Sequence, residues 1–593
     1  MPRTSAPTQP RRPLARRIAL LTAATASLGM VPRIAPAAAA QGCAGPLARA
    51  QAGTVCGTSQ PVPLNPGQAT VNVFRGIRYA RAARWQPPEP YTWTGVDTAT
   101  AAGPVCPQPV SPTAVNPPPQ SEDCLYLNVW APQASAGTDT LPVLVFIHGG
   151  AFVTGAGSSP LYDGAYMAAA GNVVVVTLNY RLGPLGFLYL GPSYGAGTNG
   201  NFGLLDQREA LTWVQNNISA FGGSRGKVTV FGESAGAMSV GFHLFTMRSS
   251  NNLFRAAIME SNPMGVVYRD TTRAASDGGV YVDSLCNHAM SGSPCQRTLA
   301  WLQSVPLDTV MKVASIYDTT GTIGRIRKGH LAEALPWTPV VDSSLVLQEP
   351  YLGYASGMTP KPLVFGMNRD EGMIFAAMAQ QKEGALLDPV TYGFLVDGMF
   401  PGNGDAVTGY GSVRTGFPYK ALLHPRIGVL DRTPSAIAQL ITDYAFAAGN
   451  LGAANRAYAQ RTSGAPVYGY FFQQQPFFNL YPGLAACAPP QPFVCHAYEL
   501  PYVFNTLAYA QTANGGNSPI QKSDTTMARR MVAAWARFAR TLGAPESGWQ
   551  PYTTNGSVWV LDGTTNGSMS STLPTTSNAT GLWFTIPPLS ATK

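Results

Sequence analysis

The sequence predicts an α/β protein built on a large, mostly parallel central sheet, with helices on both faces and long loop insertions. Short apolar runs rich in β-branched residues recur along the chain, and their lack of polar alternation is typical of strands covered on both faces. Helix-like segments lie between these runs, and strands that alternate with helices form parallel sheets. The 593 residues are 45% hydrophobic and 12% charged, a balance that suits a large buried core and argues against a disordered chain.

The elements of this fold can be placed in order along the chain. The expected strands are the apolar runs at residues 141–147, 173–178, 228–231, 363–365 and 467–472. Residues 205–216 are expected to form a helix, because Leu211, Trp213 and Val214 stand among charged residues. No repeat interrupts residues 41–593, so we expect a single domain there. The polar tail is expected to pack on this domain through apolar side chains, namely Val558, Trp559, Leu561, Trp583 and Phe584.

The first 40 residues have the pattern of a secretory signal peptide. No acidic residue precedes position 41, whereas six arginines do: Arg3, Arg11, Arg12, Arg16, Arg17 and Arg33. An apolar stretch at 18–31, too short to span a bilayer, leads into the Ala-rich segment 35–40. We expect cleavage near Ala40, a secreted or periplasmic protein and no transmembrane anchor. The Arg11-Arg12 pair leaves twin-arginine export open beside the ordinary Sec route.

The charge balance argues against a nucleic-acid partner. The whole chain carries a formal net charge of +9, from 39 basic and 30 acidic residues. Without the six N-terminal arginines, 33 basic residues face 30 acidic ones, and the net charge falls to +3. A nucleic-acid-binding domain is expected to be strongly basic, so this class of function is excluded.

Eight cysteines, an even number, fit an oxidising compartment. They fall in near pairs along the chain, and this spacing favours four local disulfides: Cys43–Cys56, Cys106–Cys124, Cys286–Cys295 and Cys487–Cys495. A lipidated Cys43 is the alternative for the first pair, but the residues before it make a poor lipobox. We expect no metal site, because no CxxC pair occurs and the six histidines are scattered. No cofactor is required.

The pattern GxSxG occurs twice, and the context of each copy distinguishes them. A serine nucleophile on a sharp turn needs a strand before it and a helix after it. Ser234 follows the expected strand 228–231, whereas Ser224 precedes that strand. Gly232 and Gly236 relieve crowding around a strained residue. We therefore expect Ser234 to be the nucleophile and Ser224 to be an ordinary turn serine.

A glycine-rich loop follows the expected strand 141–147. It reads HGGAF at residues 148–152. Acyl transfer needs backbone amides that hold the developing oxyanion, and these come from such a loop and from the residue after the nucleophile. His148 is expected to shape the loop and not to move protons. The expected donors are the N–H groups of Gly149, Gly150 and Ala235.

A histidine base should follow the serine along the chain, with an acid between them. Beyond residue 300 the histidines are His330, His424 and His496. His496 is favoured because it comes late in the chain, next to a cysteine that can pin its loop. The candidate acids are Asp342, Asp370 and Glu371. The loop after the strand 363–365 is where such an acid belongs, but the residues alone leave Asp370 and Glu371 equally open.

These residues resemble the type B carboxylesterases, the family that also contains the cholinesterases. The similarity covers nearly all of residues 41–593 and rests on FRGIRYA at 74–80, SEDCLYLNV at 121–129, LNYRLG at 178–183, GNFGLLDQ at 200–207 and FGG at 221–223. It implies the α/β-hydrolase fold and a Ser-His-Glu triad. The family carries its acid at the Glu of a DEG sequence, which is Glu371 here. His496 fits the family histidine, although Ala497 replaces the more usual Gly.

The loops closed by cysteines agree with the family pattern in part and depart from it in part. The resemblance implies the bridges Cys106–Cys124 and Cys286–Cys295. Cys487–Cys495 is an added bridge, and we expect it to rigidify the loop that presents His496. Cholinesterases hold the choline cation on an aromatic face in the loop that Cys106–Cys124 closes here. That loop contains no Trp in this chain, so a choline ester is disfavoured.

The function expected from these residues is that of a secreted serine carboxylesterase, which cleaves small-molecule or polymeric esters through an acyl-enzyme. The alternatives are a lipase, a polyester- or amide-acting hydrolase of the same fold, and a non-catalytic binding module. Glu233 is expected either to bias the site electrostatically or to support the serine turn. Phe152 and Met264 are candidates for a pocket wall or for the core.

Overall fold

The computed structural model describes residues 43–109, 119–135, 140–194, 200–288, 295–319, 335–383, 432–461, 464–481, 483–491, 493–512, 519–553, 557–563 and 568–570. The chain from Cys43 onward forms one structural unit. Some expectations concern residues outside this description: the signal peptide at 1–40, His330, His424, Trp583 and Phe584.

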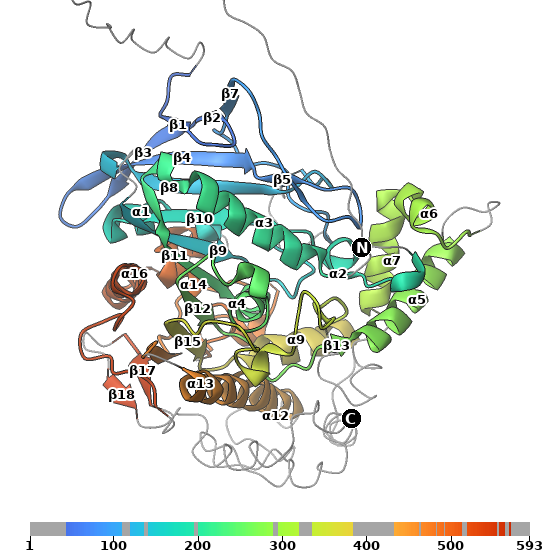
Figure 1. Cartoon of the computed structure of the whole chain (residues 1–593). Helices are drawn as coiled ribbons and strands as arrows, with labels where there is room; N and C mark the ends of the chain where they lie inside the picture. The colour runs from blue at the N-terminus through green and yellow to red at the C-terminus, as the bar shows by residue number, and fades with distance from the viewer. Residues whose placement is uncertain are drawn as a thin grey trace, which may run out of the picture. The chain divides into compact units, whose positions relative to one another are not determined.

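A central sheet organises the molecule, and 11 of its strands lie in the described residues. Seven neighbouring strands are parallel, from β10 through β9, β11, β12, β15 and β16 to β17. Antiparallel strands flank them, β8, β4 and β3 at one edge and β18 at the other (Figure 1). In spatial order the strands are β18 (Ser568–Ser570), β17 (Val558–Leu561), β16 (Val467–Phe472), β15 (Leu363–Asn368), β12 (Ala256–Glu260), β11 (Gly223–Glu233), β9 (Leu141–Ile147), β10 (Val174–Leu178), β8 (Tyr126–Pro132), β4 (Gln68–Arg78) and β3 (Thr58–Pro63).

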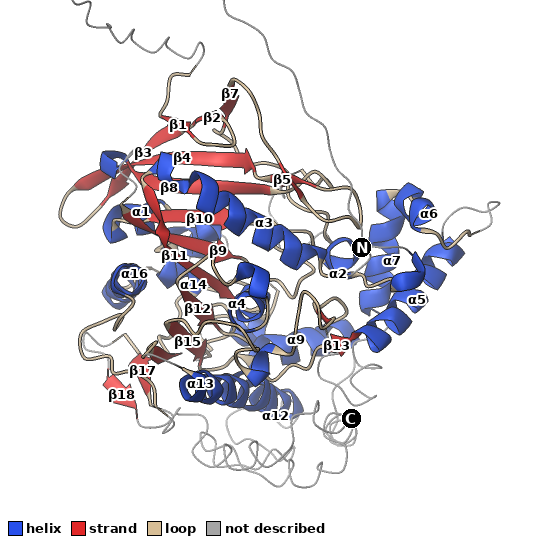
Figure 2. Ribbon diagram, in the orientation of Figure 1, coloured by secondary structure: helices blue, strands red, loops and turns tan. Residues whose placement is uncertain are grey.

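Successive residues of the central strands point to opposite faces of the sheet and so build two cores. Along β9, Val143, Val145 and Ile147 enter one core, whereas Leu144 and Phe146 enter the other. Helices cover both faces, as Figure 2 shows in blue beside the red strands. The first core includes α3 (Phe202–Asn217), α4 (Ala235–Phe245) and α13 (Gly449–Gln460), and the second includes α1 (Ala165–Gly171), α14 (Leu500–Val503) and α16 (Lys522–Thr541).

Long insertions join the later strands of the sheet. Between β12 and β15 the described residues include the helices α5, α6 and α7 and the short strands β13 and β14, and α9, α12 and a π-helix lie between β15 and α13. These elements are β13 (Arg269–Asp270), α5 (Thr271–His288), α6 (Leu299–Ser304), α7 (Leu307–Thr319), β14 (Val340–Val341), α9 (Gly372–Glu383), α12 (Arg432–Ile441) and the π-helix η8 (Thr442–Ala448). The remaining short elements are β1 (Leu47–Arg49), β2 (Thr54–Cys56), β5 (Ala80–Arg81), β6 (Glu89–Pro90), β7 (Val96–Thr98), α2 (Gly183–Phe187) and α15 (Leu507–Thr512).

The predicted elements are present, with one correction. The runs 141–147 and 467–472 match β9 and β16 residue for residue, and the tail contributes β17 to the sheet. The strand expected at 228–231 is longer, because β11 already begins at Gly223. Ser224 therefore lies in a strand, and the prediction that it stands in a turn was wrong.

The cysteines pair as their spacing predicted. The four bridges are Cys43–Cys56, Cys106–Cys124, Cys286–Cys295 and Cys487–Cys495, and no free cysteine is left in the described residues. None of the helices in the described part of the chain combines the length and apolar character needed to cross a bilayer.

Candidate active site

Ser234 occupies the turn between β11 and α4. The strand ends at Glu233 and the helix begins at Ala235, so the serine stands alone between them (Figure 1). Its φ of 56° lies in the left-handed region, which L-residues rarely adopt. Ser234 is half-buried, whereas Glu233 and Ala235 are buried. The turn therefore leaves one hydroxyl within reach of solvent at the carboxyl end of a central strand.

Glycines on both sides allow this turn to fit between neighbouring strands. A Cβ on Gly232 would come within 2.7 Å of the Ile147 carbonyl oxygen, and a Cβ on Gly236 would overlap the same oxygen. On the other side, the Ser234 N–H donates a hydrogen bond of 3.0 Å to the Glu260 carbonyl. The backbone of the turn is thus held between the ends of β9 and β12.

The loop after β9 lies directly against the serine turn. A Cβ on Gly149 would be 3.0 Å from the Ser234 Cβ and 2.6 Å from Glu233 Oε2. Within the described residues, no loop hydrogen bond joins the N–H of Gly149 or Gly150 to a backbone carbonyl, and the Ala235 N–H, at the first position of α4, has no acceptor within that helix. They are therefore available to an oxygen atom that is bound beside Ser234.

The shape of this loop depends on an unusual backbone and on a neutral histidine. Burial lowers the pKa of His148 to about 4, so its ring is uncharged at neutral pH. The ring stacks on Tyr180, and its Nδ1 lies 2.8 Å from the Gly149 carbonyl oxygen. These contacts suit a histidine that shapes the loop. Three consecutive residues that follow have positive φ angles, namely Gly150 (107°), Ala151 (54°) and Phe152 (61°).

The structure brings His496 and Glu371 together. Glu371 follows β15 and is fully buried, and its Oε2 lies 2.5 Å from His496 Nδ1. The other carboxylate oxygen, Oε1, accepts a hydrogen bond of 2.6 Å from the Asn368 N–H. The Asn368 N–H and His496 Nδ1 thus hold the two oxygens of the Glu371 carboxylate, and the carboxylate in turn orients the imidazole ring.

The other two candidate acids have structural partners. Asp370 Oδ2 accepts a hydrogen bond of 2.8 Å from the Val494 N–H. Asp342 Oδ1 accepts the N–H groups of Ser344, Leu345 and Val346 in a tight turn. Of the three acids, Glu371 is the one that contacts His496.

A second carboxylate faces the other side of His496. Glu233 Oε1 lies 3.1 Å from His496 Nε2. Burial raises the pKa of Glu233 to about 8, and the charges of Glu499 and Glu371 act in the same direction. Burial by itself lowers the pKa of His496, but the carboxylates of Glu233 and Glu371 outweigh it and raise this pKa to about 9. The two carboxylates therefore favour the charged form of the imidazole.

A third buried carboxylate, Glu499, escaped the sequence reasoning. Its Oε1 accepts a hydrogen bond of 3.0 Å from Ser261 Oγ, and its Oε2 accepts one from Asn368 Nδ2. Burial raises its pKa, and the charge of Glu371 raises it further. Its two donors stand at the carboxyl ends of neighbouring strands, Ser261 just after β12 and Asn368 at the end of β15, and no local pattern in the sequence reveals that they meet Glu499. This polar cluster supports the underside of the site.

Two aromatic rings also flank His496. The ring centroids of Phe375 and Phe446 lie 5.2 Å and 5.3 Å from that of the imidazole. Phe375 belongs to α9, which begins directly after Glu371, and Phe446 belongs to the π-helix η8. The His496 ring is therefore packed between carboxylates and aromatic rings.

Comparison with known proteins places this arrangement in a family. The family model described as "Carboxylesterase family" matches residues 44–579. The chain belongs to the carboxylesterase family. It is a carboxylic ester hydrolase with the α/β-hydrolase fold.

Individual relatives agree with this assignment. The para-nitrobenzyl esterase of Bacillus subtilis is 34% identical over 500 residues, which cover 81% of this carboxylesterase and 89% of the relative. The acetylcholinesterase of Bungarus fasciatus is 33% identical, with coverage of 86% and 81% respectively. A solved PNB esterase superposes with a TM-score of 0.70 at 32% identity, covering 88% of this chain and 96% of that one.

The two apolar candidates for a pocket wall are core residues in this carboxylesterase. Phe152 is fully buried and packs edge to face against Phe187 at 4.9 Å between ring centroids. Met264 is also buried within the same core. Neither side chain offers surface to a ligand in the structure as described.

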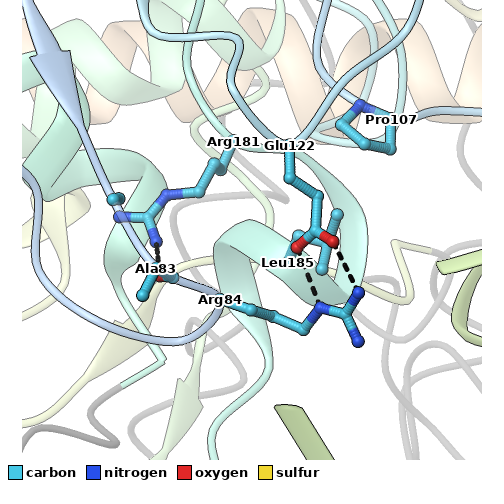
Figure 3. Close-up of a pocket in the computed structure, with 7 residues that line it drawn as sticks. Ala83, Arg84, Pro107, Glu122, Arg181 and Leu185 are labelled. Carbon is cyan, nitrogen blue, oxygen red and sulfur yellow. Dashed lines mark hydrogen bonds and ion pairs between the residues drawn. The ribbon is translucent and has the colours of Figure 1, made fainter. Parts of the chain in front are cut away.

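A small recess lies at the loop that Cys106–Cys124 closes (Figure 3). Arg84 forms a double hydrogen bond with Glu122 there, and Arg181 donates to the Ala83 carbonyl. None of the residues that line the recess belongs to the Ser234 site. Arg84 pairs with Glu122 within the recess and Arg181 pairs with the buried Asp206 behind it, so all three charged side chains of the lining already have ionic partners. Within the described residues, no cluster of three or more His, Cys, Asp or Glu side chains suits a metal ion.

Proposed function

We propose that this carboxylesterase cleaves esters by double displacement, with Ser234 as nucleophile, His496 as base and Glu371 as the acid that orients it. The observation that carries the proposal is the 2.5 Å contact between Glu371 and His496. The other side of the His496 ring faces Glu233, which directly precedes the strained Ser234 in the chain. A strand-to-helix turn of this kind exposes a nucleophile, and an oriented imidazole activates it.

The first half-reaction forms the acyl-enzyme. Ser234 Oγ attacks the ester carbonyl carbon while His496 Nε2 accepts the hydroxyl proton. For this transfer Nε2, which lies 3.1 Å from Glu233 Oε1, must be directed at the serine oxygen. The Glu371 carboxylate then stabilises the imidazolium, which gives its proton to the departing alcohol.

The carbonyl oxygen becomes negatively charged during the attack. We propose that the N–H groups of Gly149, Gly150 and Ala235 hold it, which supplies stabilisation that strengthens as the charge develops. In the second half-reaction His496 takes a proton from water, and the resulting hydroxide attacks the acyl carbon. The carboxylic acid leaves and Ser234 regains its proton.

We also propose that the enzyme works outside the cytoplasm. The four disulfides support this placement, because such bonds persist in oxidising compartments. Its substrates are proposed to be non-choline esters, since the loop closed by Cys106–Cys124 lacks a Trp. A hydrolysis panel of short aryl esters, long-chain acyl esters, aromatic diesters and tricarballylic esters would define the preferred class.

The catalytic assignment is tested with Ser234→Ala and the matched control Ser224→Ala. Hydrolysis of a p-nitrophenyl ester should fall by at least about 10³-fold in the first variant, because the nucleophile is removed. The second serine stands in the other GxSxG copy, so its variant should keep parental turnover. Parental turnover in Ser234→Ala would overturn the proposal.

A further inference from the structure

The loops that carry Glu371 and His496 are joined to each other just outside the proposed triad. The Asp370 N–H donates a hydrogen bond of 3.0 Å to the Val494 carbonyl, and Asp370 Oδ2 accepts one of 2.8 Å from the Val494 N–H. Asp370 and Cys495 also form a parallel β-bridge. Asp370, which precedes Glu371, is thus paired with Val494 and Cys495, which precede His496.

A disulfide closes the second loop at the same place. Cys495, which directly precedes His496, is bonded to Cys487, and both cysteines are buried. The Cys495 carbonyl accepts a hydrogen bond of 3.1 Å from Asn368 Nδ2, and the Cys487 carbonyl accepts one of 2.6 Å from the Tyr498 hydroxyl. The backbone that carries the imidazole is therefore fixed from both sides.

These links compensate for the lack of regular structure around the base. Between β16 and α14 the described residues form only one short 3₁₀ turn, Ala485–Cys487. A loop without a ladder of backbone hydrogen bonds does not hold a ring to within a fraction of an ångström by itself. The 2.5 Å contact between Glu371 and His496 requires that accuracy.

We propose that Asp370 and the Cys487–Cys495 bridge form a clamp that positions His496 against Glu371 and so sets the catalytic rate. The inference rests on the proposed triad and adds a role to an acid that does not touch the imidazole. Asp370 acts through Val494, and the disulfide acts through Cys495. Both act on the backbone that ends at His496, so their effects should not be independent.

The test compares Asp370→Ala, the double variant Cys487→Ala/Cys495→Ala and the combination of all three changes. Each of the first two should lower kcat for a p-nitrophenyl ester by about tenfold or more, because a misplacement of about 1 Å costs up to about 10²-fold in rate. KM should change less than about twofold, since the clamp acts on the position of His496, whose proposed role lies in the chemical step. The combined variant should lose less than the product of the two separate losses.

Two further readouts separate positioning from stability. Looser contact with Glu371 should lower the pKa of His496, so the acid limb of the kcat/KM profile should move to lower pH in the clamp variants. Asp370→Asn keeps an oxygen that can accept the Val494 N–H, and it should restore kcat to within about threefold of the parent. The matched control Cys286→Ala/Cys295→Ala removes a bridge of similar span, with a sequence separation of 9 instead of 8. This control should lower the melting temperature and leave kcat and the pH profile unchanged.

The outcomes distinguish the clamp from the triad. If Asp370→Ala and the bridge variant fold, melt at lower temperature and keep parental kcat and pH profile, the clamp proposal is wrong. An Asp370→Asn variant as slow as Asp370→Ala would also overturn it, because the bond to Val494 would not be the link. Circular dichroism identifies a variant that fails to fold. If either Asp370→Ala or the bridge variant does so, the kcat and pH profile of the other one test the clamp. Full activity of Glu371→Gln would contradict the proposed triad instead.

Discussion

His496 lies between two buried carboxylates, with Glu371 at Nδ1 and Glu233 at Nε2. Their negative charges raise the pKa of the imidazole to about 9 against the opposing effect of burial. A general base must be neutral to accept a proton, so a raised pKa moves its working range to higher pH. In the proposed mechanism the same charges stabilise the imidazolium that forms when Ser234 attacks. Glu233 thus lowers the fraction of His496 that is neutral at a given pH, and it stabilises the imidazolium form.

This arrangement predicts the pH dependence of the reaction. The value of kcat/KM should rise with pH up to about 9, because deprotonation of His496 generates the active base. In Glu233→Gln the first of the raising charges is removed, so the pKa of His496 should fall and the acid limb should shift to lower pH. The measurement is the kcat/KM profile of a p-nitrophenyl ester between pH 5 and 10, within the range where uncatalysed hydrolysis can be subtracted.

Glu89→Gln serves as the control for this experiment. Glu89 is an exposed residue whose carboxylate lies 3.6 Å from Arg81, and its charge should not reach His496. Its profile should overlay that of the parent. An unchanged acid limb in Glu233→Gln would show that Glu233 has only a structural role in the turn.

At the scale of elements, the site depends on how closely β9, β11 and α4 approach one another. The serine turn and the glycine-rich loop meet where Gly149, Gly232 and Gly236 leave no room for a side chain. The strain at Ser234 is maintained by this packing and by its bond to the Glu260 carbonyl. A change in this contact should affect stability and catalysis together.

Gly236→Ala tests this packing. Its Cβ would overlap the Ile147 carbonyl oxygen, so the start of α4 or the end of β9 must shift. We expect a loss of about 1–3 kcal/mol in the free energy of unfolding, measured by urea denaturation, and a fall in kcat. In Gly226→Ala, from the other GxSxG copy, the nearest atom to the new Cβ would be Ser224 Oγ at 3.8 Å. This control should stay within about 0.5 kcal/mol of the parent. Equal stability of the two variants would contradict the account of the turn.

At the scale of the whole molecule, the sequence predicted the sheet and the four disulfides because both leave local signals. Runs such as 141–147 and 467–472 are continuous in the chain, and each cysteine has its partner nearby. Long-range contacts leave no such signal. Glu499 receives hydrogen bonds from residues 238 and 131 positions away, so its burial was not visible in the chain.

The same reasoning explains what was corrected or left open in the site. The residues alone left Asp370 and Glu371 open because they are neighbouring carboxylates, the family resemblance pointed to Glu371, and in the structure it is Glu371 that contacts His496. The extension of β11 to Gly223 comes from pairing with Leu141, although residues 224–227 are polar or small. Phe152 was open between pocket and core, and in the structure its ring is buried and packs against Phe187.

The central claim is that Ser234 is the activated nucleophile of this carboxylesterase, and covalent labelling tests it most directly. A fluorophosphonate reacts with a serine hydroxyl that a neighbouring base activates, and peptide mass mapping locates the adduct. We predict one adduct per chain, on the peptide that contains Ser234, prevented by an ester substrate and absent from Ser234→Ala. A stoichiometric adduct on Ser224 or any other residue, or full labelling of Ser234→Ala, would contradict the account.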